Sequence, residues 1–129
     1  MIEAVLDASA LLALLLAERG GDEVGTVFAN SAMTTVNLCE VVGHFARNGA
    51  AEADIRLVLD PLPIERIPFD DDLAFAAGLL LPATRKSGLS FGDRACLALA
   101  ARLNVRALTA DRSWRSIARS VGVDIHPIR

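Results

Sequence analysis

The sequence is poor in cysteine, in aromatic residues and in long hydrophobic runs, and each shortage excludes a class of protein. Its two cysteines, Cys39 and Cys96, form no C-x-x-C pair, which argues against a disulfide framework or a zinc site. The densest apolar run, Ala10–Ala17, is eight residues long and ends at Glu18, whereas a membrane span needs roughly 18 or more. No basic leader precedes an apolar region at the N-terminus. We therefore expect a reduced, cytoplasmic protein with no membrane segment.

The chain does contain enough apolar mass for a folded core. Of its 129 residues, 53% are hydrophobic, 22% are charged and only 5% are aromatic. The apolar residues are mostly Ala, Leu, Val and Ile, which favours helices packed on a buried sheet. The length, together with the lack of any repeat or linker, predicts a single domain over residues 1–129.

Short apolar runs alternate with longer stretches of helical spacing. The runs with the length and boundaries of buried strands are Ile2–Leu6, Met33–Val36, Glu65–Pro68, Val105–Thr109 and Asp124–His126. The helical stretches are Ser9–Glu18, Asp22–Ala29, Leu38–Asn48, Ala51–Leu59, Asp71–Leu81, Phe91–Leu103 and Arg112–Val121. This alternation predicts an α/β fold, a three-layer α/β/α sandwich with a mainly parallel central sheet of four or five strands.

Four acidic residues lie where these strands end or the next helices begin. Asp7 follows the first strand, and Glu40 lies in the first turn of the helix after the second. Asp93 opens the Phe91–Leu103 helix, and Asp111 follows the fourth strand. Because ligands of open α/β sheets bind beyond the carboxyl ends of the strands, we expect the four carboxylates to meet at one edge of the sheet.

Each acid, taken alone, has a stronger structural interpretation. Asn37-x-x-Glu40 and Ser90-x-x-Asp93 have the form of helix capping boxes, and Asp7 and Asp111 could be ordinary acids at helix starts. Together the four indicate a metal site, because carboxylates gathered in one pocket repel one another unless a cation neutralises them. Carboxylates without His or Cys partners suit Mg²⁺ or Mn²⁺, and such a site fits metal-assisted hydrolysis of phosphodiester bonds.

The segments that carry these acids resemble those of PIN-domain ribonucleases, most closely the VapC toxins of bacterial type II toxin–antitoxin systems. The resemblance rests on four blocks in the same order and spacing: Val5-Leu6-Asp7-Ala8-Ser9, Asn37-Leu38-Cys39-Glu40-Val41, Ser90-Phe91-Gly92-Asp93-Arg94-Ala95 and Leu108-Thr109-Ala110-Asp111. It implies a PIN-like fold and an endoribonuclease that uses Mg²⁺ or Mn²⁺ and leaves 3′-hydroxyl and 5′-phosphate ends.

The resemblance also implies roles for individual residues. Asp7, Glu40 and Asp93 match the three core acids and Asp111 the fourth, all expected to be catalytic and to hold metal. Ser9 and Thr109 match supporting hydroxyl groups. Some relatives have a further acid shortly after the fourth, where Ser113 stands here, so the ligands of a second metal stay open.

The formal net charge of −3 hides a basic C-terminal third, in which residues 85–129 carry nine basic residues against three acids. Within it, Arg94, Arg112 and Arg115 are candidates for RNA contact, and Arg112, Arg115 and Arg119 have the spacing of one helix face. A solvated helix face explains this spacing equally well. We expect Trp114 and both cysteines to pack in the core.

The resemblance implies protein partners as well. These are a cognate VapB-type antitoxin and a second copy of the chain, giving a homodimer and a toxin–antitoxin hetero-oligomer. Two other interpretations stay open: a PIN nuclease of RNA maturation outside toxin–antitoxin biology, and a non-catalytic PIN scaffold. Phosphotransfer domains of the receiver or haloacid-dehalogenase type need paired acids or D-x-D near the first strand, and Asp7-Ala8-Ser9 fits neither.

Overall fold

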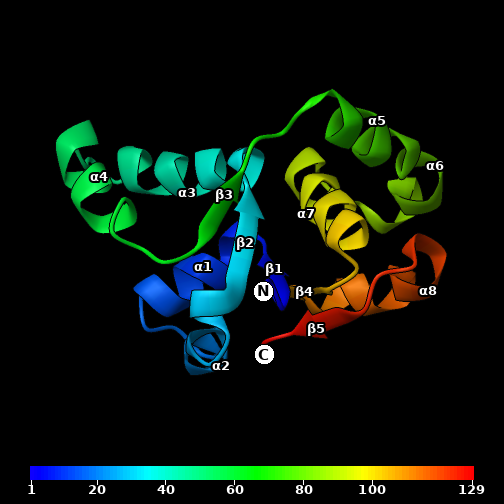
Figure 1. Ribbon diagram of the computed structural model, residues 1–129, viewed down its shortest axis with the longest axis horizontal. Coiled ribbons are helices and arrows are strands. Elements are labelled where there is room, and N and C mark those ends of the chain that lie inside the picture. Colours follow the sequence, from blue (N-terminus) through cyan, green and yellow to red (C-terminus); the bar gives the residue numbers. More distant parts are fainter.

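The predicted strands form a single sheet in which every neighbouring pair is parallel. In the computed structural model, which describes residues 1–129, the strands follow the order β3-β2-β1-β4-β5 (Figure 1). They are β1 (Ala4–Leu6), β2 (Ser31–Thr34), β3 (Glu65–Ile67), β4 (Arg106–Thr109) and β5 (Ile125–Pro127). The five-stranded parallel sheet confirms the predicted fold class, and it places β1 in the middle.

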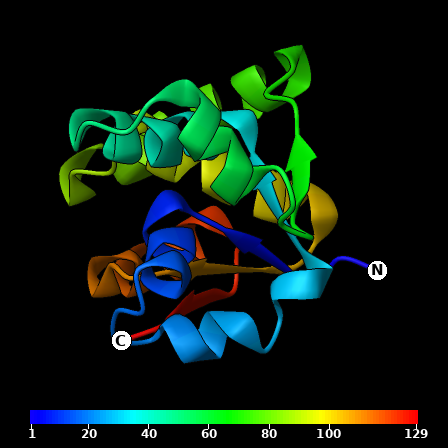
Figure 2. The ribbon, with the colours of Figure 1, turned by 90° about the vertical axis from the view of Figure 1, so that its left-hand side faces the viewer.

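Helices cover both faces of this sheet. One side carries α1 (Ala8–Leu15), α2 (Gly21–Gly25), α3 (Thr35–Arg47) and α4 (Glu52–Leu59). The other carries α5 (Asp71–Leu79), α6 (Leu81–Thr84), α7 (Phe91–Leu103) and α8 (Ala118–Val121). Short 3₁₀ turns occupy Phe28–Asn30, Arg85–Ser87 and Arg112–Ile117. The two helical groups flank the strands in Figure 1, and Figure 2 views the molecule from the side of α1–α4, so the molecule has three layers.

Two separate hydrophobic cores hold these layers together. Alternate residues of each strand point to opposite faces, so Leu6, Met33 and Leu108 pack against α1–α4. Val5, Ala32 and Ala107 pack against α5, α7 and the last helical turns. Every residue of β1 is fully buried, as expected for the central strand of a parallel sheet.

The second strand ends earlier than the apolar run predicts. Thr34 ends β2 and caps α3, because its Oγ1 accepts a hydrogen bond from the backbone N–H of Asn37 at 3.1 Å. Thr35 and Val36, assigned to the strand from sequence, therefore lie in the helix. The predicted capping box headed by Asn37 is wrong, and Asn37 is a fully buried residue of the helix instead.

The stretch predicted as one helix, Arg112–Val121, is a 3₁₀ turn followed by α8. The side chain of Asp111 accepts a bond from the Ser113 N–H, and the Ser116 hydroxyl donates to the Ser113 carbonyl. Such local bonds compete with the regular α-helical pattern. Arg119 consequently lies in a different element from Arg112 and Arg115, so the expected single basic face is not formed.

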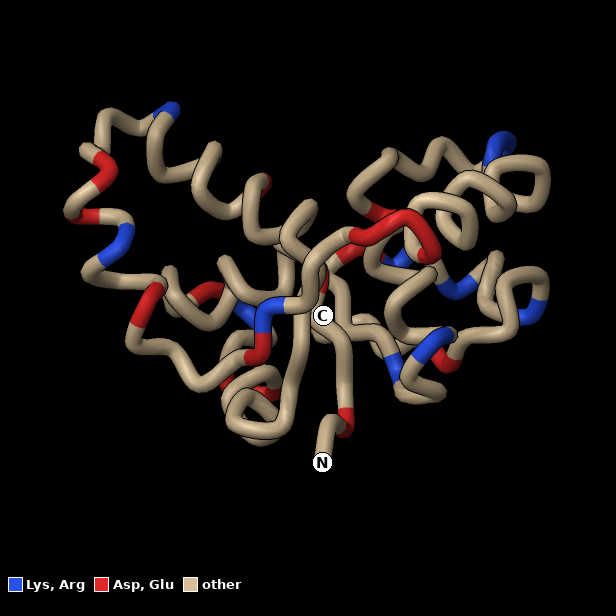
Figure 3. The backbone as a smooth tube through the Cα atoms, turned by 45° about the horizontal axis from the view of Figure 1, so that its top comes forward, with Lys and Arg blue, Asp and Glu red and all other residues tan.

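The remaining predictions for the core are largely confirmed. Trp114 and Cys96 are fully buried, whereas Cys39 is exposed, so its assignment to the core is wrong. None of the helices has the length and apolar character needed to cross a membrane. Most Lys and Arg residues lie on the side of α5–α8 (Figure 3), as the basic C-terminal third of the sequence indicates.

Candidate active site

Asp7 stands at the end of the central strand, and three hydrogen bonds fix its carboxylate. Oδ1 accepts from the Ser9 hydroxyl at 2.7 Å and from the Ala10 N–H at 2.8 Å. Oδ2 accepts from the Thr109 hydroxyl at 2.6 Å, which connects β1 to the end of β4. The hydroxyls of Ser9 and Thr109 therefore both donate to Asp7, and they allow this buried carboxylate little freedom to rotate.

The surroundings of Asp7 oppose its ionisation. Burial raises its pKa from 3.8 to about 6, although the bonds from Thr109, Ser9 and Ala10 act to lower it. The nearby charge of Asp93 adds to the rise. A cation beside the carboxylate would reverse this effect by favouring the charged form.

Glu40 lies on α3 and is tied to the start of α7 through Asn37. The Asn37 side-chain amide donates to Glu40 Oε1 at 2.8 Å and to the Gly92 carbonyl at 3.1 Å, while its oxygen accepts from the Thr34 hydroxyl. A Cβ at Gly92 would overlap the Glu40 carboxylate, so a side chain there would displace the carboxylate from its present position. The close approach of α3 to α7 depends on this pair, Asn37 and Gly92.

Asp93 has a structural role as well as a place at the site. The predicted capping box with Ser90 is present: Asp93 Oδ2 accepts from the Ser90 N–H at 2.9 Å, and Ser90 Oγ accepts from the Asp93 N–H at 3.2 Å. Its pKa is raised, chiefly by burial and in addition by the charge of Asp111, against the lowering effect of hydrogen bonds from the backbone and the side chain of Ser90. Asp93 Oδ1 takes part in no hydrogen bond, so it is free to accept a ligand.

Asp111 follows the end of β4, at the same edge of the sheet. It is exposed, and its Oδ1 caps the following 3₁₀ turn by accepting from Ser113 N–H at 2.9 Å. Its own N–H donates to the Thr109 hydroxyl oxygen at 3.1 Å. Thr109 therefore links Asp111 to Asp7, and the effect of Asp111 on the pKa of Asp93 places their charges close together.

Three of the four acids surround one hollow, which we call the acidic hollow. Asp7, Glu40 and Asp93 line it, its volume is about 560 Å³, and Asp111 is not part of its wall. The same three carboxylates act on the thiol of Cys96, whose pKa is raised first by burial and then by their charges. Negative charge from the end of β1, from α3 and from α7 is thus concentrated on one space at the carboxyl edge of the sheet.

The donor chemistry of this hollow fits a hard divalent cation. Every candidate ligand is a carboxylate, the type of oxygen that Mg²⁺ and Mn²⁺ prefer. The raised pKa of Asp7 marks a buried anion that lacks a positive partner. In this structure no three His, Cys, Asp or Glu side chains are spaced closely enough to enclose an ion. Binding would therefore require the acids to draw together or water to complete the shell.

Two polar side chains of the acidic hollow are not among the site residues selected from the sequence. His44 and Arg47 line it from α3, one and two turns after Glu40, and this helical spacing was the signal available. The arginines that were selected are elsewhere: Arg94 donates to the Leu89 carbonyl at 3.1 Å and Arg112 to the Arg129 carbonyl at 2.7 Å. Neither they nor the exposed Arg115 line the hollow.

Comparison with known proteins gives a consistent result. A sequence model of the PIN domain matches residues 4–120. Among solved structures, the DNA-bound VapBC of Salmonella typhimurium gives a TM-score of 0.76 at 15% identity and covers 100% of both chains. FitAcB of Neisseria gonorrhoeae gives 0.74 at 15% identity, covering 97% of both. VapBC-5 of Mycobacterium tuberculosis, described as a member of the VapBC family of toxin–antitoxin systems, gives 0.65 at 27% identity, covering 98% of this chain and 99% of its own. Comparison with curated proteins finds no match.

Proposed function

This chain belongs to the PIN domain family, whose members are generally nucleases that use a divalent metal, and on that basis we propose that it is a Mg²⁺- or Mn²⁺-dependent endoribonuclease. We take residues 1–129 as one PIN domain acting in the cytoplasm. The observation that supports the proposal best is the buried Asp7 carboxylate, fixed by Ser9 and Thr109 and facing Glu40 and Asp93 across the acidic hollow.

The proposed ligands are Asp7, Glu40 and Asp93, with Asp111 acting beside Asp93, directly or through water. The metal, when bound, supplies a Lewis acid that polarises the phosphoryl oxygen and makes a water molecule more acidic. Attack of water on phosphorus then breaks the P–O3′ bond, which leaves a 5′-phosphate on one product and a 3′-hydroxyl on the other.

The residues of the chain orient this reaction. The bonds from Ser9, Ala10 and Thr109 hold Asp7 in one direction, so that little reorganisation is needed when charge develops. Asn37 occupies Glu40 Oε1, which leaves Oε2 to bind metal or to accept a proton from the attacking water. Arg47, the basic side chain in the wall of the hollow, would bind a phosphate next to the cleaved one.

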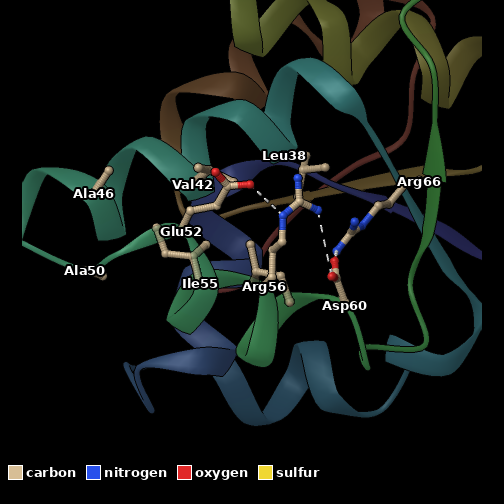
Figure 4. A pocket seen from close by; sticks show the side chains of 10 residues that line it. Leu38, Val42, Ala46, Ala50, Glu52, Ile55, Arg56, Asp60 and Arg66 are labelled. Atoms are coloured by element: carbon tan, nitrogen blue, oxygen red, sulfur yellow. Dashed lines mark hydrogen bonds and ion pairs between the residues drawn. The ribbon is translucent and has the colours of Figure 1, made fainter.

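We further propose that the nuclease is the toxin of a VapBC-type pair, held inactive by a VapB-type antitoxin in a hetero-oligomer that contains a toxin homodimer. Support comes from the shared fold with chains of three toxin–antitoxin complexes over nearly their whole length. An apolar groove of about 320 Å³ between α3 and α4, lined by Leu38, Val42 and Ile55 among others, offers a place for an antitoxin helix (Figure 4). Arg56 pairs with Glu52 and Asp60 at its border.

The direct test is cleavage of end-labelled single-stranded RNA by Asp93→Asn. The amide oxygen can still accept the Ser90 N–H bond, so the capping box survives while one anionic ligand is lost. We expect cleavage to be abolished in Asp93→Asn and to persist in Asp71→Asn, an exposed acid on α5 that serves as the matched control. Chelation with EDTA should stop the wild-type reaction.

Two outcomes would contradict the proposal. Cleavage at the wild-type rate by Asp93→Asn would show that the site is wrongly assigned. A folded wild-type protein that cuts no RNA with either Mg²⁺ or Mn²⁺ would favour the non-catalytic scaffold instead.

A further inference from the structure

A second hollow shares Glu40 with the acidic hollow and lies between the first turns of α3 and α7. Its volume is about 470 Å³, and it is lined by Thr35, Val36, Cys39, Glu40, Ser90, Phe91 and Gly92. We call it the Phe91 hollow. Glu40 is its only charged residue, so its wall offers no cation to a phosphate. What it offers is an aromatic ring and small polar groups, which suit an uncharged, flat ligand.

Phe91 is the large apolar side chain of this hollow, and it is 53% exposed. Its ring packs edge-to-face on the partly buried Phe69, with centroids 5.4 Å apart and planes at 85°. That contact holds the ring from one side and leaves the rest of its surface open. Phe91 is also the first residue of α7, two positions before Asp93, so a rigid helical turn fixes its place relative to the proposed metal ligands.

Two hydroxyl groups lie in the wall of the hollow. Thr35 Oγ1 accepts from the Phe69 N–H at 3.0 Å, and Ser90 Oγ accepts from the Asp93 N–H at 3.2 Å. The Ser90 hydroxyl also acts on the Asp93 carboxylate, whereas the Thr35 hydroxyl donates to no group of the protein. Thr35 is therefore available to donate to a ring nitrogen or carbonyl oxygen at the edge of a nucleobase.

We propose that the Phe91 hollow is a nucleobase subsite, in which a base of single-stranded RNA next to the scissile phosphate stacks on Phe91 and accepts a hydrogen bond from Thr35. This inference rests on the proposed nuclease function, because the adjacent acidic hollow is where the phosphate would be cut. Stacking on an aromatic side chain is a common way for proteins to hold unpaired bases. The subsite would make Phe91 a determinant of substrate binding and not a catalytic residue.

Cys39 provides a built-in probe, because its exposed thiol lines the Phe91 hollow. The other thiol, Cys96, is fully buried, so a maleimide should react with Cys39 alone. The rate of this modification is measured on the cleavage-deficient Asp93→Asn protein, with four homopolymer oligoribonucleotides and with an abasic oligomer of equal length. We expect base-containing oligomers to slow the reaction, and the abasic oligomer, which has the same phosphates, to leave it unchanged.

The matching variants are Phe91→Ala, Phe91→Trp and Phe75→Ala. Phe75 is 74% exposed on α5 and lies outside both hollows, so it controls for loss of an exposed aromatic ring. Phe91→Ala should weaken binding of base-containing oligomers by about 5- to 150-fold, the range for removal of one stacking ring. Phe91→Trp and Phe75→Ala should bind like the parent protein, and far-UV circular dichroism should show that all three are folded.

Failure of the subsite can be told apart from failure of the nuclease. If the wild type cleaves RNA but Cys39 is not protected, or Phe91→Ala binds like Phe75→Ala, the subsite is wrong and the nuclease stands. If base-dependent protection occurs without any cleavage, the subsite stands and the nuclease is wrong. Loss of dimerisation in Phe91→Ala with unchanged RNA binding would assign the ring to a protein interface and overturn the subsite.

Discussion

Replacing Asp7 by Asn should make the metal-free protein more stable at neutral pH while it removes the activity. A carboxyl whose pKa is raised on folding binds its proton more tightly in the folded state. The protonated carboxyl therefore stabilises the folded state to the full extent below about pH 4, and this stabilisation is lost as the pH rises through about 6. At neutral pH the folded protein carries an ionised Asp7 that its surroundings disfavour.

The magnitude follows from the shift in pKa from 3.8 to about 6. It corresponds to about 3 kcal/mol of lost stability at neutral pH. The Asn side chain keeps an acceptor for Ser9 and Ala10 but offers N–H to Thr109, whose hydroxyl must turn toward Ser9 Oγ, 3.4 Å away. The weakened bond costs about 1 kcal/mol. The net gain of about 2 kcal/mol should raise Tm by about 7 °C in a domain of this size.

The assay is thermal unfolding in EDTA, followed by the fluorescence of Trp114, the single and fully buried tryptophan. Asp7→Asn should unfold at a higher temperature than the wild type near pH 7 and at a similar temperature near pH 4, where the wild-type carboxyl is protonated. Mg²⁺ should raise Tm of the wild type and have little effect on the variant. A variant that is less stable than the wild type near pH 7, or that gains equally at both pH values, would refute the reasoning.

Two further substitutions test the packing of α3 against α7. Gly92→Ala should force the flexible end of Glu40 aside. We expect the free energy of unfolding, followed through Tm, to fall by less than about 1 kcal/mol, and the rate of RNA cleavage to fall about 100-fold. An unchanged rate would contradict this. Asn37→Ala removes the acceptor of the buried Thr34 hydroxyl and the side-chain bond to the Gly92 carbonyl, so urea unfolding should show a loss of about 2 kcal/mol. A loss below about 0.5 kcal/mol would argue against that network.

The sequence predicts well those features that depend on neighbours in the chain. The alternation of apolar runs with helical stretches is sufficient for the parallel sheet, and the Ser90–Asp93 capping box is visible because both of its bonds are local. The support of Asp7 by Ser9 is implied by the family resemblance, and the bond that provides it spans only two positions. These features require no knowledge of the tertiary structure.

Features that depend on distant contacts were misjudged or missed. Asn37 resembles a cap in the local sequence, but its amide is held by the carbonyl of Gly92, 55 positions further on, and that bond appears only after folding. Cys39 was placed in the core because cysteine is usually buried, yet it faces outward beside Glu40. The place of Arg47 in the acidic hollow depends on how α3 is oriented over the sheet. The amino-acid sequence alone gives no direct information on the orientation of α3 over the sheet.

The hydrogen bond from Thr109 to Asp7 spans 102 positions, and this distance bears on how the protein is made. During synthesis β1 emerges before its neighbour β4, which carries the Thr109 hydroxyl. Until β4 has emerged, Asp7 lacks the strand and the donor that orient it. Under the proposed function, a chain that ends before Thr109 cannot complete the cutting site, and such fragments should be harmless to RNA.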